Sequence, residues 1–142
     1  MTLDRELVTR KLLLITADID PLREIHQKGI EAFLGSRIDQ AVVERILELA
    51  ITRIIDVNYH VITALGQPPP SDYHSSFSRL GELNILTGEF ARRIASAAGL
   101  RNRLVHDYED LDPHKIFEAV GSALQDLPIY VSRVSDFLNR SG

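Results

Sequence analysis

Residues 36–65 read SRIDQAVVERILELAITRIIDVNYHVITAL, and this stretch decides the fold. Ser36, with Asp39 three residues later, predicts the start of a helix and a capping box. More than one face of this helix is apolar, since large aliphatic side chains stand at 38, 42, 43, 46, 47, 49, 51, 54, 55, 57, 61, 62 and 65. A helix with so much apolar surface is buried on two sides. We expect either the central helix of a bundle or a helix that packs on a neighbour and on a second subunit.

Helical patterns also precede this stretch. Residues 4–27 carry apolar side chains at three- and four-residue spacings, which predicts a helix. Pro21 either begins a fresh helix or kinks a continuous one, and we favour the kink. The glycine-flanked residues 29–35 predict a break, and the proline-rich residues 66–72 end the central helix in a stiff loop.

Two more helical regions follow the loop. Residues 75–98 predict a weaker helical region, split near Gly88 into two short pieces. The last helix is expected over residues 113–139, with Asp112 as N-cap and a proline at the first helical position. Pro128 lies inside it and should bend it. No stretch alternates apolar and polar residues over enough positions to predict a strand. We therefore expect an all-α, up-and-down bundle of four to five helices.

Composition limits the class of protein. A chain of 142 residues forms one domain with a sizeable core, so residues 1–142 are expected to be a single domain. No apolar run could span a membrane and no signal peptide is visible, so the cytoplasm is the expected location. The absence of cysteine excludes disulfides and cysteine nucleophiles. The net charge of −4 disfavours non-specific coating of nucleic acid and leaves a small anion site open.

Residues 99–108, GLRNRLVHDY, are the candidate functional stretch. They close a window, residues 90–106, that holds four arginines and no acidic residue, which is a local basic patch suited to an anion. On a helix, Arg101 and Tyr108 would lie on nearly the same face, because they are seven residues apart.

Asn102 and His106, four residues apart, would share a different face, so Arg101 and His106 cannot stack directly. A groove between the two faces would need another surface to close it. We expect a two-fold dimer to bring two copies of the stretch together.

These residue types suit phosphodiester cleavage in RNA. A histidine with a pKa near about 6.5 can take the proton of the ribose 2′-hydroxyl and supply one to the leaving 5′-oxygen. A guanidinium can hold two phosphate oxygens and stabilise the charge that develops on them. The five histidines show no metal-ligand spacing, so we expect no metal and no cofactor. The alternative is that Arg101 and His106 are ordinary surface residues or make a structural hydrogen bond.

Other polar residues have simpler interpretations. Asp56 and His60 share one face of the central helix among aliphatic residues, and we expect a satisfied polar pair at a bundle or dimer seam rather than a catalytic pair. Tyr59, Tyr73 and Tyr130 are expected to pack with their rings and to keep their hydroxyls at the surface.

The segment Arg101 to Tyr108, an arginine followed by a polar residue, three more and a histidine, resembles the signature of the HEPN superfamily. The tyrosine two residues after the histidine resembles the HepT-like branch, the toxin half of type VII-like toxin–antitoxin pairs. The resemblance extends to the leading helix, to the Ile-Ile-Asp-Val run of the long helix and to the proline-rich loop that ends at Tyr73.

The resemblance implies a homodimeric, metal-independent RNase with the two motifs facing each other across a dimer cleft. His106 would be the acid–base group, Arg101 would hold the phosphate, and Asn102 would support the site, with Asp56 and Arg103 as further supporting residues. The partner would be a minimal nucleotidyltransferase (MNT) antitoxin that silences the toxin by adding AMP to Tyr108. The alternative function is a non-catalytic helical binding partner of a nucleotidyltransferase.

Overall fold

The computed structural model describes residues 2–141, and at Tyr108 it describes the backbone alone. Over these residues the secondary structure consists of α-helices and one short 3-10 turn, with no strand, so the predicted all-α class is confirmed. The elements in chain order are α1 (Arg5–Gln27), α2 (Ile30–Leu34), α3 (Arg37–Ala64), α4 (Tyr73–Glu82), α5 (Gly88–Ile94), α6 (Ser96–His106), η1 (Tyr108–Asp110) and α7 (Pro113–Ser141).

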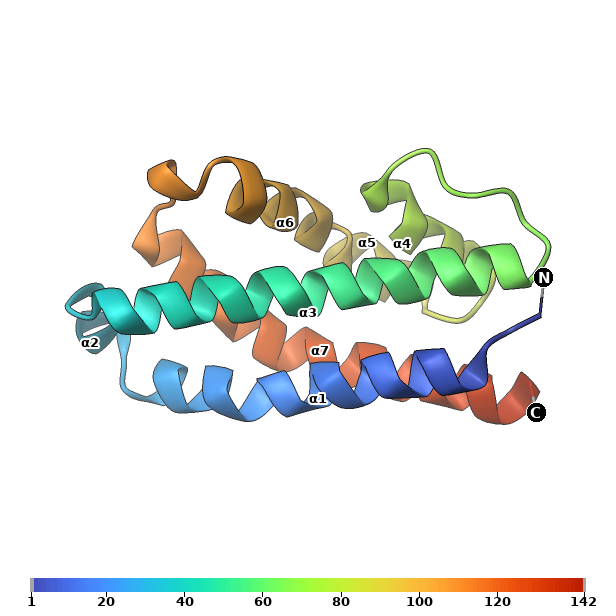
Figure 1. Ribbon diagram of the computed structural model, residues 1–142, viewed down its shortest axis with the longest axis horizontal. Helices are drawn as coiled ribbons and strands as arrows, with labels where there is room; N and C mark the ends of the chain where they lie inside the picture. The colour runs from blue at the N-terminus through green and yellow to red at the C-terminus, as the bar shows by residue number, and fades with distance from the viewer. Residues whose placement is uncertain (1, 142) are drawn as a thin grey trace.

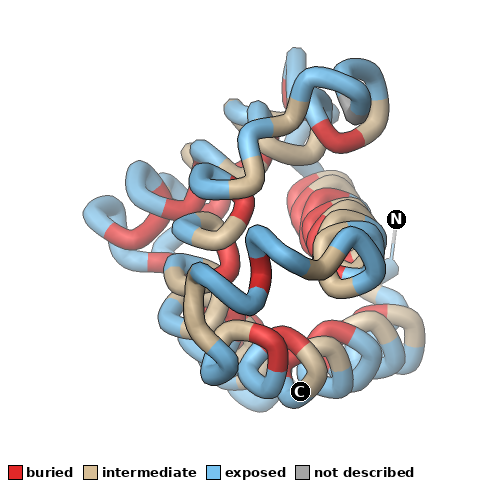
Figure 2. The backbone as a smooth tube through the Cα atoms, turned by 90° about the vertical axis from the view of Figure 1, so that its left-hand side faces the viewer, coloured by how far each residue is buried: buried red, intermediate tan, exposed pale blue. Residues whose placement is uncertain are grey.

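The long helix α3 lies at the centre of the bundle. Figure 1 shows α1, α3 and α7 running along the length of the molecule, with α4, α5 and α6 on the other side of α3. α3 packs against α1 on one side and against α4 and α6 on the other. Seen end-on in Figure 2, the buried segments of these helices face one another. α3 was expected either to be the central helix of a bundle or to pack on a second subunit. Contacts within one chain bury most of its apolar surface, as expected of a central helix.

The start of α3 follows the local signal in residues 36–39. The Ser36 hydroxyl accepts a hydrogen bond from the Asp39 backbone N–H at 3.1 Å, as an N-cap does. The Asp39 carboxylate lies 3.3 Å from Lys28 Nζ, in an ion pair. The predicted capping box is therefore half formed, because its acidic member is paired with a neighbouring lysine.

The segment between α1 and α3 differs from the prediction. α1 is one continuous helix through Pro21, as favoured over a fresh helix at that residue, and Gly29, with a φ of 94°, follows its C-cap. The expected break nevertheless contains α2. This short helix forms because Phe33 buries its ring, which lies 5.5 Å from that of Phe117 on α7, so tertiary packing rather than local propensity stabilises it.

The region after the loop also divides more finely than predicted. α4 begins at Tyr73, ahead of the expected start, because Asp72 and Ser75 form a complete capping box. The break near Gly88 is confirmed by Thr87, which caps α5. Asp112 accepts a hydrogen bond from the His114 N–H at 3.0 Å before α7, and α7 continues to Ser141 with Pro128 inside it.

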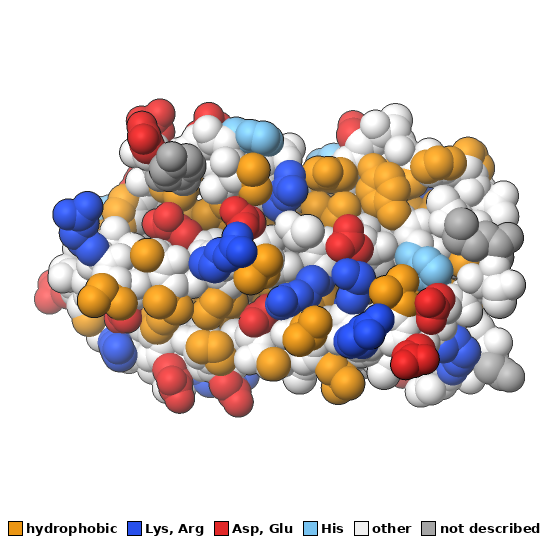
Figure 3. Space-filling view, in the orientation of Figure 1, with side chains coloured by type: hydrophobic (Ala, Val, Ile, Leu, Met, Phe, Trp, Pro, Cys, Tyr) orange, Lys and Arg blue, Asp and Glu red, His pale blue; other side chains and the backbone are white. Residues whose placement is uncertain are grey.

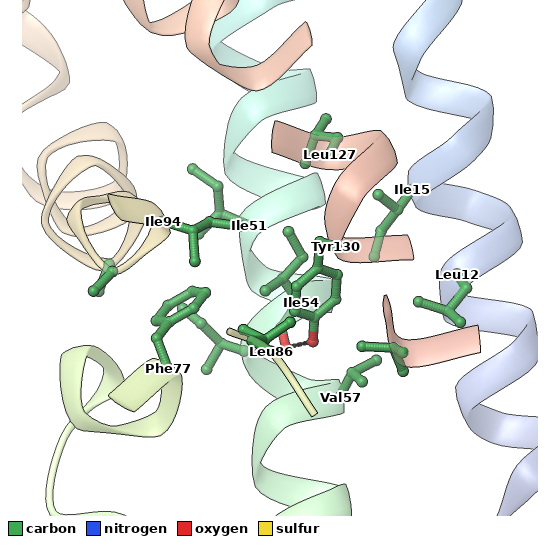
Figure 4. Close-up of a cluster of buried hydrophobic side chains, with 14 of the residues drawn as sticks. Leu12, Ile15, Ile51, Ile54, Val57, Phe77, Leu86, Ile94, Leu127 and Tyr130 are labelled. Carbon is green, nitrogen blue, oxygen red and sulfur yellow. Dashed lines mark hydrogen bonds between the residues drawn. The ribbon is translucent and has the colours of Figure 1, made fainter. Parts of the chain in front are cut away.

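Tyr130 corrects one expectation. Its hydroxyl was expected at the surface, but the whole side chain is buried between α3 and α7, as Figure 4 shows. The hydroxyl donates to Asn58 Oδ1 at 2.5 Å, and the Ile54 carbonyl oxygen lies 3.3 Å away. The ring fits the core because its one polar atom has partners there.

None of the helices over residues 2–141 is long and apolar enough to cross a membrane.

Candidate functional site

Arg101 is held by the packing of its own helix. Ala98 and Leu104, three residues to either side, are buried and anchor α6 against the bundle. Residues three apart share one helix face, so Arg101 points toward α3 and is half-buried. The apolar neighbours thus direct a charged side chain inward from a helix whose other polar residues face solvent.

Two other helices contact the Arg101 guanidinium. Its Nε donates to the Thr52 hydroxyl on α3, at 3.4 Å. Its central carbon lies 5.3 Å from the centroid of the Tyr73 ring on α4, which is a cation–π contact. α3 and α4 therefore position this arginine in the folded monomer.

Arg101 closes one side of a pocket of about 270 Å³, which we call the tyrosine pocket. The surface is hollowed between α4 and α6 in Figure 3. Tyr59 and Tyr73 form two of its walls, with ring centroids 6.1 Å apart in an edge-to-face arrangement. The pocket is lined by Thr52, Ile55, Asp56, Tyr59, Tyr73 and Arg101.

The phenol of Tyr59 stays protonated in this setting. Burial raises its pKa, and the neighbouring Tyr73 and Asp72 raise it further. A phenol whose pKa lies above its ordinary value of 10.0 keeps its proton at neutral pH. Tyr59, which lines the pocket, is therefore an O–H donor, and Asp56 contributes a carboxylate to the same lining.

A buried polar network lies behind the tyrosine pocket. Asn58 on α3 accepts from the Tyr130 hydroxyl and donates from Nδ2 to the Ser76 hydroxyl, 3.0 Å away. Ser76 in turn donates to the Tyr73 backbone carbonyl at 2.7 Å. Asn58, Ser76 and Tyr130 are all fully buried, so their bonds fix the first turn of α4 and the backbone of Tyr73.

Asp56 and His60 do not form the predicted pair. The Asp56 carboxylate lies 3.2 Å from Lys11 Nζ on α1. His60 Nε2 accepts from the backbone N–H of Asp4 at 2.9 Å. Both residues are satisfied by the start of the chain, and Asp56 alone of the two borders the tyrosine pocket.

The other predicted site residues lie apart from Arg101. Asn102 and His106 are exposed, and among the side chains that the structure describes neither has a hydrogen-bond or ion-pair partner. Arg103 borders a different pocket, of about 590 Å³, between α3, α6 and α7. One chain thus brings Arg101 and Asp56 together and leaves Asn102, Arg103 and His106 on other surfaces.

The prediction that Arg101 and Tyr108 lie seven residues apart on one helix is wrong. α6 ends at His106, where Asp107 caps it, and residue 108 belongs to the 3-10 turn η1. Helical spacing therefore does not extend to Tyr108. Its side chain lies outside the described residues, so the structure does not test the predicted modification site.

Sequence reasoning named Asp56 as a supporting residue but did not place Thr52, Tyr59 and Tyr73 beside Arg101. Thr52, Asp56 and Tyr59 are spaced by four and three residues, which places them on one face of α3. That spacing was a usable signal for the pocket wall, whereas Tyr73 comes from another helix and carried none. Within residues 2–141, no three or more His, Cys, Asp or Glu side chains are grouped as metal ligands.

Comparison with known proteins places this chain in a family. Residues 15–134 match the family described as Ribonuclease HepT-like. The chain is 36% identical over 132 residues to a tRNA nuclease HepT of Aphanizomenon flos-aquae, covering 93% of this chain and 90% of that protein. It is 21% identical over 126 residues to an mRNA nuclease HepT of Shewanella oneidensis, covering 89% and 94%.

Solved structures agree with the fold. The tri-AMPylated Shewanella oneidensis HEPN toxin in complex with an MNT antitoxin superposes with a TM-score of 0.84 at 22% identity, over 93% of this chain and 98% of that chain. A toxin–antitoxin structure with AMP-PNP gives 0.85 at 21% identity, over 93% and 99%. Together, the family match and the 36% identical relative show that this chain belongs to the HepT-like ribonuclease family.

Proposed function

We propose that this chain is the toxin of a toxin–antitoxin pair, a single-domain, metal-independent endoribonuclease that acts in the cytoplasm as a homodimer. The observation that carries the proposal is the preformed setting of Arg101, a guanidinium fixed by Thr52 and Tyr73 on the wall of a pocket. Membership of a family of ribonucleases supports the reaction class. Two relatives are named for tRNA and for mRNA, so we propose RNA as the substrate without choosing between them.

Arg101 holds the scissile phosphate in this proposal. Its guanidinium forks onto two phosphate oxygens and stabilises the charge that builds up when the ribose 2′-oxygen attacks phosphorus. The side chain is already held in place, so little conformational freedom is lost when RNA binds.

His106 transfers protons. An imidazole accepts the proton of the 2′-hydroxyl and supplies one to the 5′-oxygen as the P–O bond breaks, which leaves a 2′,3′-cyclic phosphate and a free 5′-hydroxyl. His106 is exposed near the end of α6, so a second surface has to bring it to the phosphate. Asn102, one turn earlier on the same face, supports the ring, and Asp56 and Arg103 are further supporting residues.

A second copy of the chain supplies that surface. Exposed apolar side chains gather where α2 joins α3, at the left end of the face in Figure 3. Leu34, Ile38 and Val42 are among the large apolar residues left exposed, with Ile38 at 77%. A homodimer that covers them removes apolar surface from water. Sedimentation at micromolar concentration should give a dimer, and a monomer would contradict this part of the proposal.

The proposed antitoxin is an MNT-type nucleotidyltransferase that adds AMP to Tyr108. A structural neighbour is an AMPylated HEPN toxin bound to an MNT antitoxin, which supports this choice of partner. AMP beside the phosphate site would add bulk and negative charge and so oppose RNA binding. Mass spectrometry of the co-expressed protein should find AMP on the Tyr108 peptide, and Tyr108→Phe should stay toxic in the presence of the partner. A silenced toxin with an unmodified peptide would indicate inhibition by complex formation.

The central experiment incubates purified wild type, Arg101→Ala and His106→Ala with RNA in excess EDTA. The wild type should leave cyclic or 3′-phosphate ends, and each variant should lose most activity while keeping its helical circular dichroism. Cleavage that stops with EDTA and returns with magnesium would overturn the metal-independent mechanism.

A second function, a non-catalytic binding partner of a nucleotidyltransferase, is favoured by one observation: no described side chain orients His106. The two functions differ at this residue, since binding tolerates glutamine there and proton transfer does not. A wild type that leaves RNA intact, together with His106→Gln that still binds the nucleotidyltransferase, would support the binding function.

A further inference from the structure

The tyrosine pocket has a composition that the phosphate-binding role of Arg101 does not require. Two aromatic rings, one aliphatic side chain, a hydroxyl and a carboxylate line it in addition to the guanidinium. A phosphate alone would be served by cations and N–H donors. Aromatic rings and guanidinium planes are instead the surfaces on which unstacked bases of single-stranded RNA stack.

The size of the pocket fits one base. Its volume of about 270 Å³ is just below the range of about 300–1,000 Å³ typical of sites for drug-sized molecules. It therefore suits a single ring system whose sugar and phosphate lie outside it. Arg101 stands on the wall, so a nucleotide with its base inside can place its phosphate at the guanidinium.

We propose that the tyrosine pocket is a subsite for a nucleobase with hydrogen-bond donors on its Watson–Crick edge, and for guanine above the other bases. This proposal rests on the proposed function, because it takes RNA as the ligand of the same surface. Asp56 provides the selectivity, since an ionised carboxylate only accepts hydrogen bonds. Guanine presents two adjacent donors, N1–H and N2–H₂, whereas uracil presents one N–H between two carbonyl oxygens that a carboxylate repels.

The surroundings of Asp56 support this role. Lys11 lies 3.2 Å from Oδ2 and fixes the carboxylate from the α1 side. Tyr59 lines the same pocket, and its protonated hydroxyl is a donor of the kind that the guanine O6 acceptor needs. The network of Asn58 and Ser76 holds the Tyr73 backbone, so this wall is formed before RNA binds.

The test uses the four ribonucleoside 3′-monophosphates as probes, titrated into the full chain and followed by NMR or calorimetry. The wild type should bind guanosine 3′-monophosphate about tenfold more tightly than uridine 3′-monophosphate, as a good carboxylate–base pair discriminates. Asp56→Asn should bring this ratio close to one. A ratio near one in the wild type, or an unchanged ratio in Asp56→Asn, would overturn the proposal.

Two variants serve as controls. Glu48→Gln neutralises another carboxylate of α3, one that pairs with Arg45 at 2.6 Å and lies outside the pocket, so the guanine preference should remain. Lys11→Met breaks the ion pair that fixes Asp56 but keeps the carboxylate, so the guanine preference should decrease without disappearing. Loss of the preference in Lys11→Met would assign it to the ion pair and overturn the acceptor role of Asp56.

The experiments can contradict the base subsite and the nuclease function independently of each other. A chain that prefers guanosine 3′-monophosphate but leaves RNA intact would contradict the nuclease function and support the subsite. A chain that cleaves RNA but binds the four nucleotides equally would contradict the subsite alone.

Discussion

Arg101 and His106 lie five residues apart on α6, and their surroundings are opposite. Arg101 contacts Thr52 on α3 and the Tyr73 ring on α4, and a buried network stabilises the backbone of that tyrosine. His106 is the last residue of the helix and is exposed, with no partner among the described side chains.

This difference separates two tasks within one motif. One chain alone positions the group proposed to hold phosphate, whereas the group proposed to move protons needs a second surface. Orientation contributes strongly to rate when reacting groups are held in place. The folded monomer would then have the binding half of the site, and assembly would supply the catalytic half.

The largest expected effect is on the kinetics of RNA cleavage. It separates proton transfer by His106 from phosphate binding by Arg101. His106→Gln should lower kcat about 100- to 10,000-fold, the usual contribution of a general acid–base, and leave KM for RNA nearly unchanged. Arg101→Lys keeps the charge but loses the planar fork and the cation–π geometry, so KM should rise as well. Steady-state kinetics on one short RNA would measure kcat and KM for both variants. A rise in KM in His106→Gln, with KM unchanged in Arg101→Lys, would contradict the division of roles between the two residues.

The next effect is on stability, and two asparagines make a matched pair. Asn58→Leu removes the amide that bonds the buried Tyr130 and Ser76 hydroxyls and leaves each with one backbone carbonyl as its partner, so it should lower the free energy of unfolding by about 1–3 kcal/mol. Asn102→Leu, the same change on exposed α6, should stay within about 0.5 kcal/mol. Urea unfolding followed by circular dichroism gives both values. Equal losses would show that α6 is as constrained as the core.

A smaller effect tests how Arg101 is held. Thr52→Val preserves the shape of the side chain and removes the hydroxyl that accepts from Arg101 Nε. One hydrogen bond is worth about 0.5–1.5 kcal/mol, so RNA binding should weaken about two- to tenfold. Thr16→Val is the control, because that hydroxyl bonds only to the Leu12 carbonyl of its own helix. Unchanged binding in Thr52→Val would leave Tyr73 as the main support.

The smallest effect concerns how the stability of the contact between α1 and α3, next to Thr52, depends on pH. Burial raises the pKa of Asp18, and Arg53, 3.0 Å away, opposes that shift. A raised pKa means that ionising Asp18 costs folding free energy. Its stabilising contribution is therefore present below the ordinary pKa of 3.8 and lost as pH rises through the folded-state value. Relative to Asp18→Asn, the wild type should lose stability in thermal melts as pH rises from the ordinary pKa of Asp18 to its raised folded-state pKa. If the melting temperatures of the two proteins change with pH in parallel, the raised pKa is contradicted.

Local signals in the sequence determined most of the helices. The Ser36 cap, the apolar periodicity of α3 and the Asp112-Pro113 start of α7 each act within a few residues, so their outcome was predictable. The Arg101–His106 motif was visible for the same reason, because its residues are neighbours in the chain. Membership of the HepT-like ribonuclease family agrees with the resemblance drawn from that motif.

Tertiary structure decided the rest. α2 forms where glycines predicted a break, since Phe33 packs against a helix about 80 residues later in the chain. Tyr130 is buried because Asn58, 72 residues earlier, accepts its hydroxyl. Tyr73 lies beside Arg101 because α4 and α6 pack on the same side of α3. A helical period specifies which side chains share a face, but the partner of that face depends on contacts between distant segments, which form only when the whole core is buried.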